Sequence, residues 1–329
     1  MNTQTIYNMV KASGVSAGEM VLIHFWGEDC QKSIANQFVT AVAALGATPV
    51  LLQQSRTINR NLFSTAKGTC FDDRYFKLFS NFDAVLDVFA YQPVQLGYTL
   101  AEPQMLLYRQ YMANLFHSFM DCKRFTQIRF PTKENAEESG LAPDDYIERM
   151  TKAYDINYAQ LKNACLEQLK TLTGMKQAAL HTGSDCILHF NFTDRSWHID
   201  AGDGDLPCGE IYIAPNEEGT NGSVFFETFY LDQKLYQNVK LDICRGEVCG
   251  CSHEELMRYF NEQPKANKII CELGFGMNPH VTSLCGCTVL DEKMEGTFHI
   301  AVGNNIMFGG KNEASCHKDF VGYGTMENL

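Results

Sequence analysis

The stretch SAGEMVLIHFWGEDCQKSIANQFVTAVAALGATPVLL (residues 16–52) decides the fold of the N-terminal part of this chain. Turn residues open the stretch and precede an apolar run at Met20–Phe25, which predicts a buried strand. Apolar side chains recur at helical spacing over Ala35–Leu45, and Gly46 is expected to end that helix. A second short strand is predicted at Pro49–Leu52. Strand, helix and strand at this spacing are typical of a βαβ unit, so we expect a parallel sheet.

The alternation of strand and helix patterns continues up to about residue 180. Further strands are predicted at Ala84–Phe89 and Arg124–Phe130, and a helix is predicted at 102–123. One long helix is predicted from Pro143 towards Gly174, with an apolar stripe that indicates packing in the core. No G-x-G-x-x-G follows the first strand and no Walker-type motif occurs, so the sequence lacks the phosphate cradle of a nucleotide site.

From about residue 177 the pattern changes to short β-rich runs separated by Gly- and Asn-rich turns. Strands are predicted at Cys186–Phe192, Ser196–Asp200, Glu210–Ala214, Val224–Tyr230, Asn267–Leu273, Thr297–Val302 and Ser315–Val321, with one helix near Ser252–Glu262. We therefore expect an α/β protein of two domains. Residues 1–180 are expected to form an N-terminal βαβ-type domain with a parallel sheet, and residues 181–329 a β-rich α+β domain.

Composition and charge narrow the class of protein. Hydrophobic residues make up 45% and charged residues 20% of the 329, which excludes wholesale disorder. A net charge of −12 disfavours nucleic acids and anionic membranes as partners. The apolar runs are too short to span a bilayer, and residues 1–19 lack the apolar core of a signal peptide, so we expect a cytoplasmic protein.

The chain contains 13 cysteines, and in a cytoplasmic protein they are most simply reduced thiols. Two groups of them invite comparison with a zinc site, namely Cys244, Cys249 and Cys251, and then Cys285 and Cys287. Their spacings do not form the two C-x₂₋₄-C pairs that are usual in structural zinc sites. The sequence therefore favours reduced cysteines over structural zinc.

Five ionisable residues lie in strand-like apolar runs of the second half: Glu210, Glu272, His299, His317 and Asp319. In a strand, alternate residues share a face, so His317 and Asp319 would project together. Each residue alone has an ordinary structural explanation, such as a buried core histidine or a carboxylate paired with a lysine. A carboxylate in an apolar strand must be paired, hydrogen-bonded or metal-bound. If these strands meet, the five residues together could hold one or two divalent cations.

The motifs around these residues resemble those of the aminopeptidase T-like metallopeptidases. The segment Gly-Glu-Ile-Tyr-Ile-Ala-Pro at 209–215 is similar to a Gly-Glu-Val-Phe-Thr-Ala-Pro-like segment of that family. Glu-Leu-Gly-Phe-Gly at 272–276, Asp-Glu-Lys at 291–293, His-Ile-Ala-Val-Gly at 299–303 and His-Lys-Asp at 317–319 follow in the family's order. Weaker matches in the N-terminal part extend the resemblance over most of the chain.

The resemblance implies a metal-dependent aminopeptidase that releases N-terminal residues from short peptides. It implies metal ligation by Glu210, Glu272, His299, His317 and Asp319, with Glu272 also acting as general base. The implied cofactors are divalent ions (Zn²⁺, Co²⁺ or Mn²⁺), two of which would polarise the substrate carbonyl and activate water. The implied assembly is a homodimer of two-domain subunits.

One departure from the family pattern bears on the reaction. The aminopeptidases carry a tyrosine about seven residues beyond the first metal-binding histidine, and here that position falls near Ile306, in a segment without tyrosine at 303–310. The variant also resembles a sister branch, the 2,5-dihydroxypyridine 5,6-dioxygenases, which hold one Fe(II). His299, His317 and Asp319 would supply the two histidines and the carboxylate of such a site, with Glu272 as another candidate ligand.

Three functions therefore remain open from the sequence. The first is an aminopeptidase-type hydrolase, the second an Fe(II) dioxygenase that cleaves a hydroxylated pyridine or related aromatic ring, and the third a metal-binding homologue without catalysis. The three carboxylates suit two hard or borderline cations better than one Fe(II), which favours the hydrolase. His280 and Asp200 are further candidates to line the site.

Overall fold

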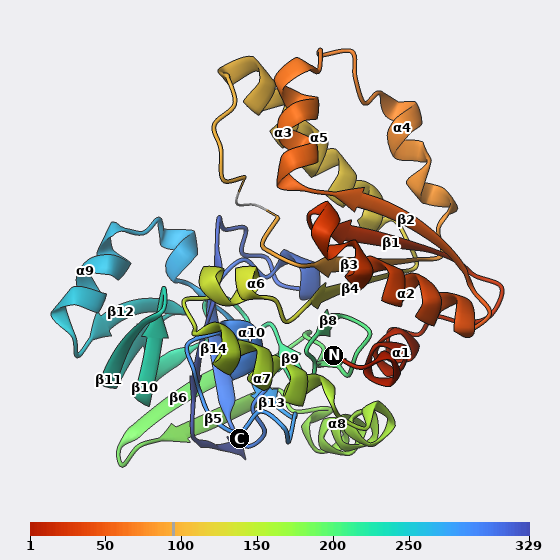
Figure 1. Ribbon diagram of the computed structural model, residues 1–329. Coiled ribbons are helices and arrows are strands. Elements are labelled where there is room, and N and C mark those ends of the chain that lie inside the picture. Colours follow the sequence, from red (N-terminus) through yellow and green to blue (C-terminus); the bar gives the residue numbers. More distant parts are fainter. Residues whose placement is uncertain (94–95) are drawn as a thin grey trace. The chain divides into compact units, whose positions relative to one another are not determined.

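The computed structural model describes residues 1–93 and 96–329 (Figure 1). Contacts between residues group the chain into two compact units. The first consists of Met1–Tyr158 with Gly202–Cys208, and the second of Ala159–Ala201 with Gly209–Leu329. The first unit contains a parallel sheet and the second contains antiparallel sheets, which confirms the predicted α/β fold class.

The sheet of the first unit has the strand order β2-β1-β3-β4-β8, and its neighbouring strands are parallel. The strands are β1 (Met20–Trp26), β2 (Thr48–Gln54), β3 (Ala84–Phe89), β4 (Arg124–Arg129) and β8 (Asp205–Leu206). The βαβ unit predicted at residues 16–52 is thus confirmed. The short β8 extends this sheet with a segment that comes much later in the sequence.

Helices cover both faces of this sheet, with α2 on one side and α3 and α5 on the other (Figure 1). The helices of the first unit are α1 (Thr3–Ala12), α2 (Lys32–Ala44), α3 (Arg56–Thr65), α4 (Asp73–Lys77), α5 (Glu102–Met120), α6 (Lys133–Glu138) and α7 (Pro143–Tyr154), with 3-10 turns η1 (Asp29–Gln31) and η2 (Phe79–Asn81). Leu22 and Val85 of the sheet pack with Phe63 of α3 and Leu115 of α5 in one apolar cluster.

The single long helix predicted from Pro143 towards Gly174 is wrong, because two helices occupy that stretch. Helix α7 ends at Tyr154, and α8 runs over Tyr158–Leu172 in the second unit. Asp155 leaves helical geometry at ψ 60°, and its N–H bonds to the carbonyls of Thr151 and Lys152. No proline or glycine lies at the break, so the apolar stripe continued through it in the sequence pattern.

The second unit contains two sheets, of strand order β12-β11-β10-β6-β5-β16 and β15-β14-β13-β9-β7. Their strands are β5 (Gln177–Thr182), β6 (Cys186–Asn191), β7 (His198–Asp200), β9 (Glu210–Ile213), β10 (Asn221–Leu231), β11 (Lys234–Cys244), β12 (Glu247–Cys251), β13 (Ile270–Gly276), β14 (Phe298–Gly303), β15 (His317–Gly322) and β16 (Thr325–Asn328). Besides α8 the unit has α9 (Glu254–Glu262), α10 (Thr288–Asp291), η3 (Lys265–Lys268) and η4 (Ile306–Phe308).

One apolar core joins the two sheets of the second unit. Leu180 and Val224 of the six-stranded sheet belong to the same cluster as Ile213, Leu273 and Ile300 of the five-stranded sheet. Phe226 and Phe229 of β10 contribute buried rings to this cluster. The five-stranded sheet thus buries one face in the core and leaves the other face for polar side chains.

The cysteines differ from the expectation in one place. Cys244 and Cys249 form a disulfide at the end of β11, which corrects the prediction that all thiols are reduced. The two residues lie on adjacent antiparallel strands, which brings their Cα atoms to 5.9 Å, within the usual range for a disulfide. Across the residues that the structure describes, no helix is both long enough and apolar enough to cross a membrane.

Candidate metal centre

In the second unit, the polar face of the five-stranded sheet β15-β14-β13-β9-β7 carries all five residues singled out in the sequence. On β9, β14 and β15 the side chains of Ile213, Ile300 and Phe320 enter the core. Their neighbours one residue away therefore point to the other face, because side chains alternate along a strand. The pairing places Glu272 of β13 in one row with Ala301 and Asp319.

A β-bulge directs Glu272 to this face. Ile270 pairs with Val302 and Glu272 pairs with Ala301, so Cys271 is an extra residue in β13. Ile270 and Leu273 both belong to the core, although they are an odd number of residues apart. Without the bulge, Glu272 would point to the core face, because residues two apart in a regular strand share a face and Ile270 lies in the core. The bulge reverses the alternation and brings the carboxylate beside the histidines.

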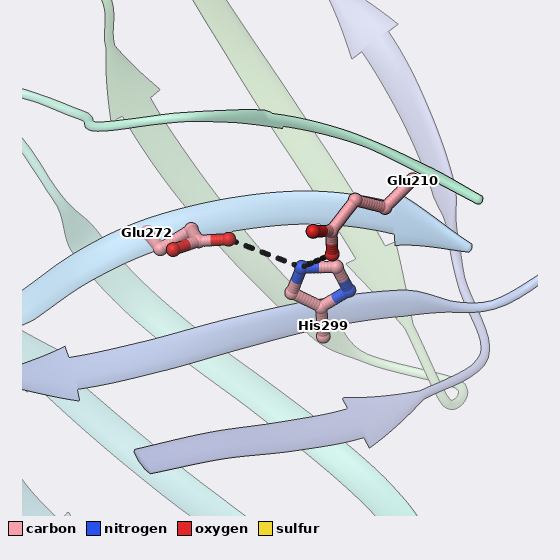
Figure 2. Close-up of side chains that lie close together, drawn as sticks. All are labelled: Glu210, Glu272 and His299. Carbon is pink, nitrogen blue, oxygen red and sulfur yellow. Dashed lines mark hydrogen bonds and ion pairs between the residues drawn. The ribbon is translucent and has the colours of Figure 1, made fainter. Parts of the chain in front are cut away.

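Two overlapping groups of side chains bring donor atoms within 4.8 Å of one another. The first contains Glu210, Glu272 and His299, as Figure 2 shows. His299 Nε2 lies 3.2 Å from Glu272 Oε1 and 3.6 Å from Glu210 Oε2. The His299 side chain is fully buried, and its Nδ1 has no hydrogen-bond partner in the described part of the chain. The ion-pair partners of its Nε2 are the carboxylates of Glu210 and Glu272.

The second group contains Glu272, His317 and Asp319. His317 Nε2 lies 3.3 Å from Glu272 Oε2 and 3.5 Å from Asp319 Oδ1. On the other side of the ring, Nδ1 lies 2.8 Å from the backbone carbonyl oxygen of Asn304, to which it can only donate. This hydrogen bond fixes the tautomer and leaves the lone pair of Nε2 free for a cation. Glu272 is thus shared by the two groups, one oxygen facing each histidine.

A buried lysine accompanies the first group. Lys293 is 1% exposed, and its Nζ lies 2.6 Å from Glu210 Oε1 and 2.8 Å from Glu292 Oε1. The Asp-Glu-Lys motif at 291–293 was noted in the sequence without a role for its lysine. Its position shows that one carboxylate oxygen of Glu210 is held by the ammonium group, while the other faces His299.

The pKa values of the cluster reflect its excess of negative charge. Burial raises the pKa of Glu210 to about 8, against the opposing charge of Lys293. Burial would also raise the pKa of Glu272, but hydrogen bonds with His299 and His317 lower it to about 2. Burial disfavours charged His299, yet its contact with Glu272 and the charge of Glu210 raise its pKa to about 9. Protons balance part of the negative charge here, and a divalent cation can take over that role.

Gly274 makes room for the imidazole of His299. The two residues are paired across β13 and β14, and a Cβ at Gly274 would lie only 2.0 Å from His299 Nε2. The imidazole ring therefore lies over Gly274. Strand β9 lies on the opposite side of β13 from the strand that carries His299. Gly274 in the motif at 272–276 thus has a steric reason, which the sequence alone did not show.

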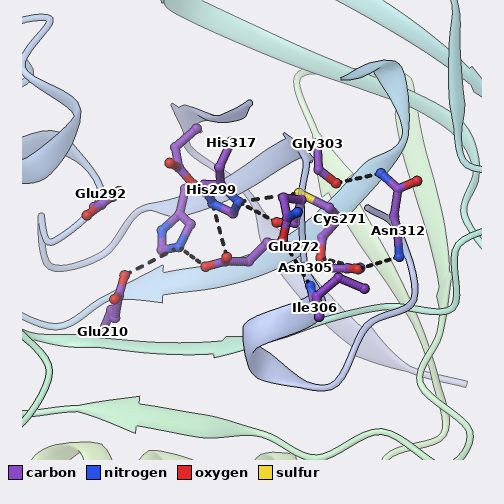
Figure 3. Close-up of polar contacts among 12 residues, drawn as sticks. Glu210, Cys271, Glu272, Glu292, His299, Gly303, Asn305, Ile306, Asn312 and His317 are labelled. Carbon is purple, nitrogen blue, oxygen red and sulfur yellow. Dashed lines mark hydrogen bonds and ion pairs between the residues drawn. The ribbon is translucent and has the colours of Figure 1, made fainter. Parts of the chain in front are cut away.

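The loop between β14 and β15 is fastened by a short network of hydrogen bonds. Asn305 is fully buried, its Nδ2 donates to the carbonyl of Cys271, and its Oδ1 accepts from the Asn312 amide (Figure 3). Glu217 accepts hydrogen bonds from the Lys311 amide at 2.5 Å and from Arg195 Nη2 at 2.6 Å. Although burial alone would raise the pKa of Glu217, these hydrogen bonds lower it. The loop that carries Asn304 is thus anchored to its neighbours.

The structure brings all five predicted residues together, in two groups that share Glu272. Asp200 of β7 is the strand partner of Glu210 of β9. Among the described residues, neither Asp200 nor His280 belongs to either group of candidate metal ligands. Sequence reasoning missed the contributions of Lys293 and Asn304. For Lys293 the only indication in the sequence was the Asp-Glu-Lys motif. Asn304 acts through its backbone carbonyl, which no residue type in the sequence can indicate.

A cluster of carboxylates and imidazoles of this kind is the type of donor set that holds divalent cations in metal-dependent enzymes. The model of the thermophilic metalloprotease (M29) family matches residues 10–322, and the chain therefore belongs to that family. The family resemblance drawn from the C-terminal motifs is confirmed. A comparison with curated proteins finds no match.

Solved structures share the fold over almost the whole chain. Wild-type AmpT from Thermus thermophilus is similar with a TM-score of 0.68 and 15% identity, over 99% of this chain and 97% of that chain. The 2,5-dihydroxypyridine dioxygenase from Pseudomonas putida KT2440 is similar with a TM-score of 0.66 and 16% identity, over 99% of this chain and 93% of that chain. At these identities the likeness extends to the fold alone.

Proposed function

We propose that this protein is a metal-dependent hydrolase of aminopeptidase type, which releases N-terminal residues from short peptides. The proposed metal ligands are Glu210, Glu272, His299, His317 and Asp319, in a site for one or two divalent ions. Membership of a metalloprotease family supports the reaction class. The observation that carries the proposal is the shared carboxylate of Glu272, which faces one histidine with each oxygen.

The donor set fits divalent cations. Glu210, Glu272 and Asp319 offer carboxylate oxygens, and His299 and His317 offer Nε2 atoms. Zinc, cobalt and manganese accept such mixed oxygen and nitrogen ligands. Without a cation, Lys293 and bound protons have to balance the negative charge of these carboxylates, and a divalent cation can take over the role of the protons. Zn²⁺, Co²⁺ or Mn²⁺ is therefore the proposed cofactor.

The residues of the site divide the work of peptide hydrolysis. A bound divalent ion supplies a Lewis acid that polarises the scissile carbonyl and makes water more acidic. Glu272 is the proposed general base: it accepts a proton from the water whose oxygen bonds to the carbonyl carbon. The C–N bond then breaks, and the proton held by Glu272 passes to the leaving amine. The Asn304 carbonyl keeps His317 in one tautomer, and Lys293 holds Glu210 in place.

Anaerobic reconstitution tests the proposed reaction class. The purified chain is stripped of metal with a chelator, and dipeptides and tripeptides are offered under strict anaerobiosis after addition of Zn²⁺, Co²⁺ or Mn²⁺. The proposal predicts release of the N-terminal residue without oxygen, because hydrolysis consumes only water. An activity that requires dissolved oxygen would contradict the hydrolase.

A second candidate is a mononuclear Fe(II) dioxygenase that cleaves a hydroxylated pyridine or a related aromatic ring. The observation that favours it is the arrangement of two histidines around one carboxylate, His299 and His317 on either side of Glu272. The absence of a tyrosine at Ile306 also departs from the aminopeptidase pattern. Stoichiometric oxygen uptake with Fe(II) and a hydroxylated pyridine would establish this function in place of the hydrolase.

The remaining proposals concern the cellular location, the oligomeric state and the binding partners of the protein. We propose a cytoplasmic homodimer whose substrate is a small peptide, with neither nucleic acid nor membrane as a partner. The net charge of −12 supports the exclusion of polyanionic partners. The family resemblance supports the dimer, and light scattering that gives a monomer mass at micromolar concentration would refute it.

A further inference from the structure

We propose that Tyr212 supplies a hydrogen-bond donor to the reacting carbonyl, from strand β9 beside the metal centre. The inference rests on the proposed hydrolase and assigns a further catalytic residue to it. In this role the phenol donates to the carbonyl oxygen of the scissile bond, which gains negative charge as water adds to the carbon. The proton stays on the phenol throughout, so the residue adds no proton-transfer step to the reaction.

The strand register places Tyr212 at the centre of the polar face. Glu210 and Tyr212 are two residues apart on β9, and their neighbour Ile213 enters the core, so both point to the metal side. Tyr212 is paired with Gly274, which is paired in turn with His299. Directly opposed residues in antiparallel strands have Cβ atoms about 5 Å apart.

The glycine in this row leaves no side chain between Tyr212 and the imidazole. A Cβ at Gly274 would lie 2.0 Å from His299 Nε2, so that nitrogen occupies the space where the opposing side chain would stand. Tyr212 therefore has the metal-facing nitrogen of His299 as its cross-strand neighbour.

Two rings hold the phenol in place. His198 of β7 stacks on Tyr212 with ring centroids 5.4 Å apart and an angle of 26°. Phe308 of the β14–β15 loop meets it edge to face, at 5.5 Å and 83°. Phe308 also contacts the ring of His317, at 6.0 Å. The same aromatic side chain thus contacts both Tyr212 and His317, a proposed metal ligand.

The hydroxyl of Tyr212 is available to a substrate. Within residues 1–93 and 96–329 it makes no hydrogen bond to the protein, and the residue is only partly buried. Burial raises the pKa of Tyr212 above the ordinary value near 10, so the phenol is protonated at neutral pH and can donate. Ile306, at the loop position where the family pattern has tyrosine, offers no hydroxyl for this role.

The test compares the wild type with Tyr212→Phe, which removes only the hydroxyl, and with Tyr323→Phe on an exposed residue as the matched control. The zinc-loaded full-length proteins are first compared for bound metal. Calorimetry then measures the affinity for the phosphonic acid analogue of leucine, which is tetrahedral at phosphorus, and for leucine itself. Peptide hydrolysis provides kcat and KM for the same three proteins.

Tyr212→Phe should keep its metal and its affinity for leucine and bind the phosphonate about tenfold more weakly or worse. Its kcat should fall about 100-fold with little change in KM, as for the loss of one donor to a developing oxyanion. Unchanged phosphonate affinity, an equal loss for leucine, or loss of bound metal would each overturn the assignment. Absence of peptide hydrolysis in the wild type would overturn the proposed function instead, while phosphonate affinity still decides the role of Tyr212.

Discussion

Gly274→Ala is the substitution whose effect on the metal centre follows most directly from the structure. The backbone of Gly274 has no strained conformation, so alanine is accepted there as far as the main chain is concerned. The added Cβ would lie 2.0 Å from His299 Nε2 and 2.3 Å from Cε1. Ordinary contacts begin at 3.4 Å, so the ring must move by about 1.4 Å.

That displacement is far larger than a metal site tolerates. Distances between a metal and its ligands vary by only about 0.2 Å, so His299 would be lost as a ligand. We expect the affinity for Zn²⁺ to fall at least about 100-fold, which corresponds to roughly 3 kcal/mol. The fold itself should lose about 1–3 kcal/mol, as is usual for one extra methyl group in a packed region.

Isothermal titration with Zn²⁺ measures the first quantity, and urea unfolding in the presence of EDTA measures the second. Gly68→Ala is the matched control, because a Cβ there meets nothing within 4 Å. Zinc affinity in Gly274→Ala within about threefold of the wild type would refute the reasoning that His299 covers this glycine and binds the metal.

Four further substitutions test other parts of the centre and its surroundings. Lys293→Met leaves two buried carboxylates without their partner and should lower the metal-free stability by about 3–5 kcal/mol in urea unfolding; a loss below about 1 kcal/mol would contradict the buried ion pairs. Glu217→Gln should cost about 1–3 kcal/mol at pH 7. Because the pKa of Glu217 is lowered from 4.5, its stabilisation is present above about pH 4.5 and is lost on acidification, so the variant and the wild type should converge in acid melting curves. His317→Ala and Asp319→Ala should each reduce bound metal without unfolding the first unit, and full metal occupancy in both would disprove the assignment.

The sequence predicted those elements whose apolar periodicity continues to their ends. The βαβ unit around Met20–Phe25 and the strand that carries His299 were found because both are almost wholly apolar. The break between α7 and α8 was missed, because the apolar stripe runs on while a single residue, Asp155, leaves helical geometry. Strand β11 was missed as well, since its polar, half-exposed pattern from Lys234 gives little contrast.

The candidate site was predicted from residue type and order, and its geometry was not. Alternation from Ile270 would have placed Glu272 in the core, and only the bulge at Cys271 corrects this. The position of Lys293 depends on the chain's return beside β9, which no local pattern encodes. The domain boundary near residue 180 stays a prediction, which limited proteolysis can test.

The most direct test of a metal centre built around Glu272 is the number of divalent ions bound per chain. Metal-free wild type and Glu272→Ala are incubated with Zn²⁺, freed of unbound metal and analysed by mass spectrometry of the elements. Because both groups of ligands share Glu272, the wild type should retain at least one ion per chain and the variant none. Equal zinc content in the two proteins would contradict the proposed centre.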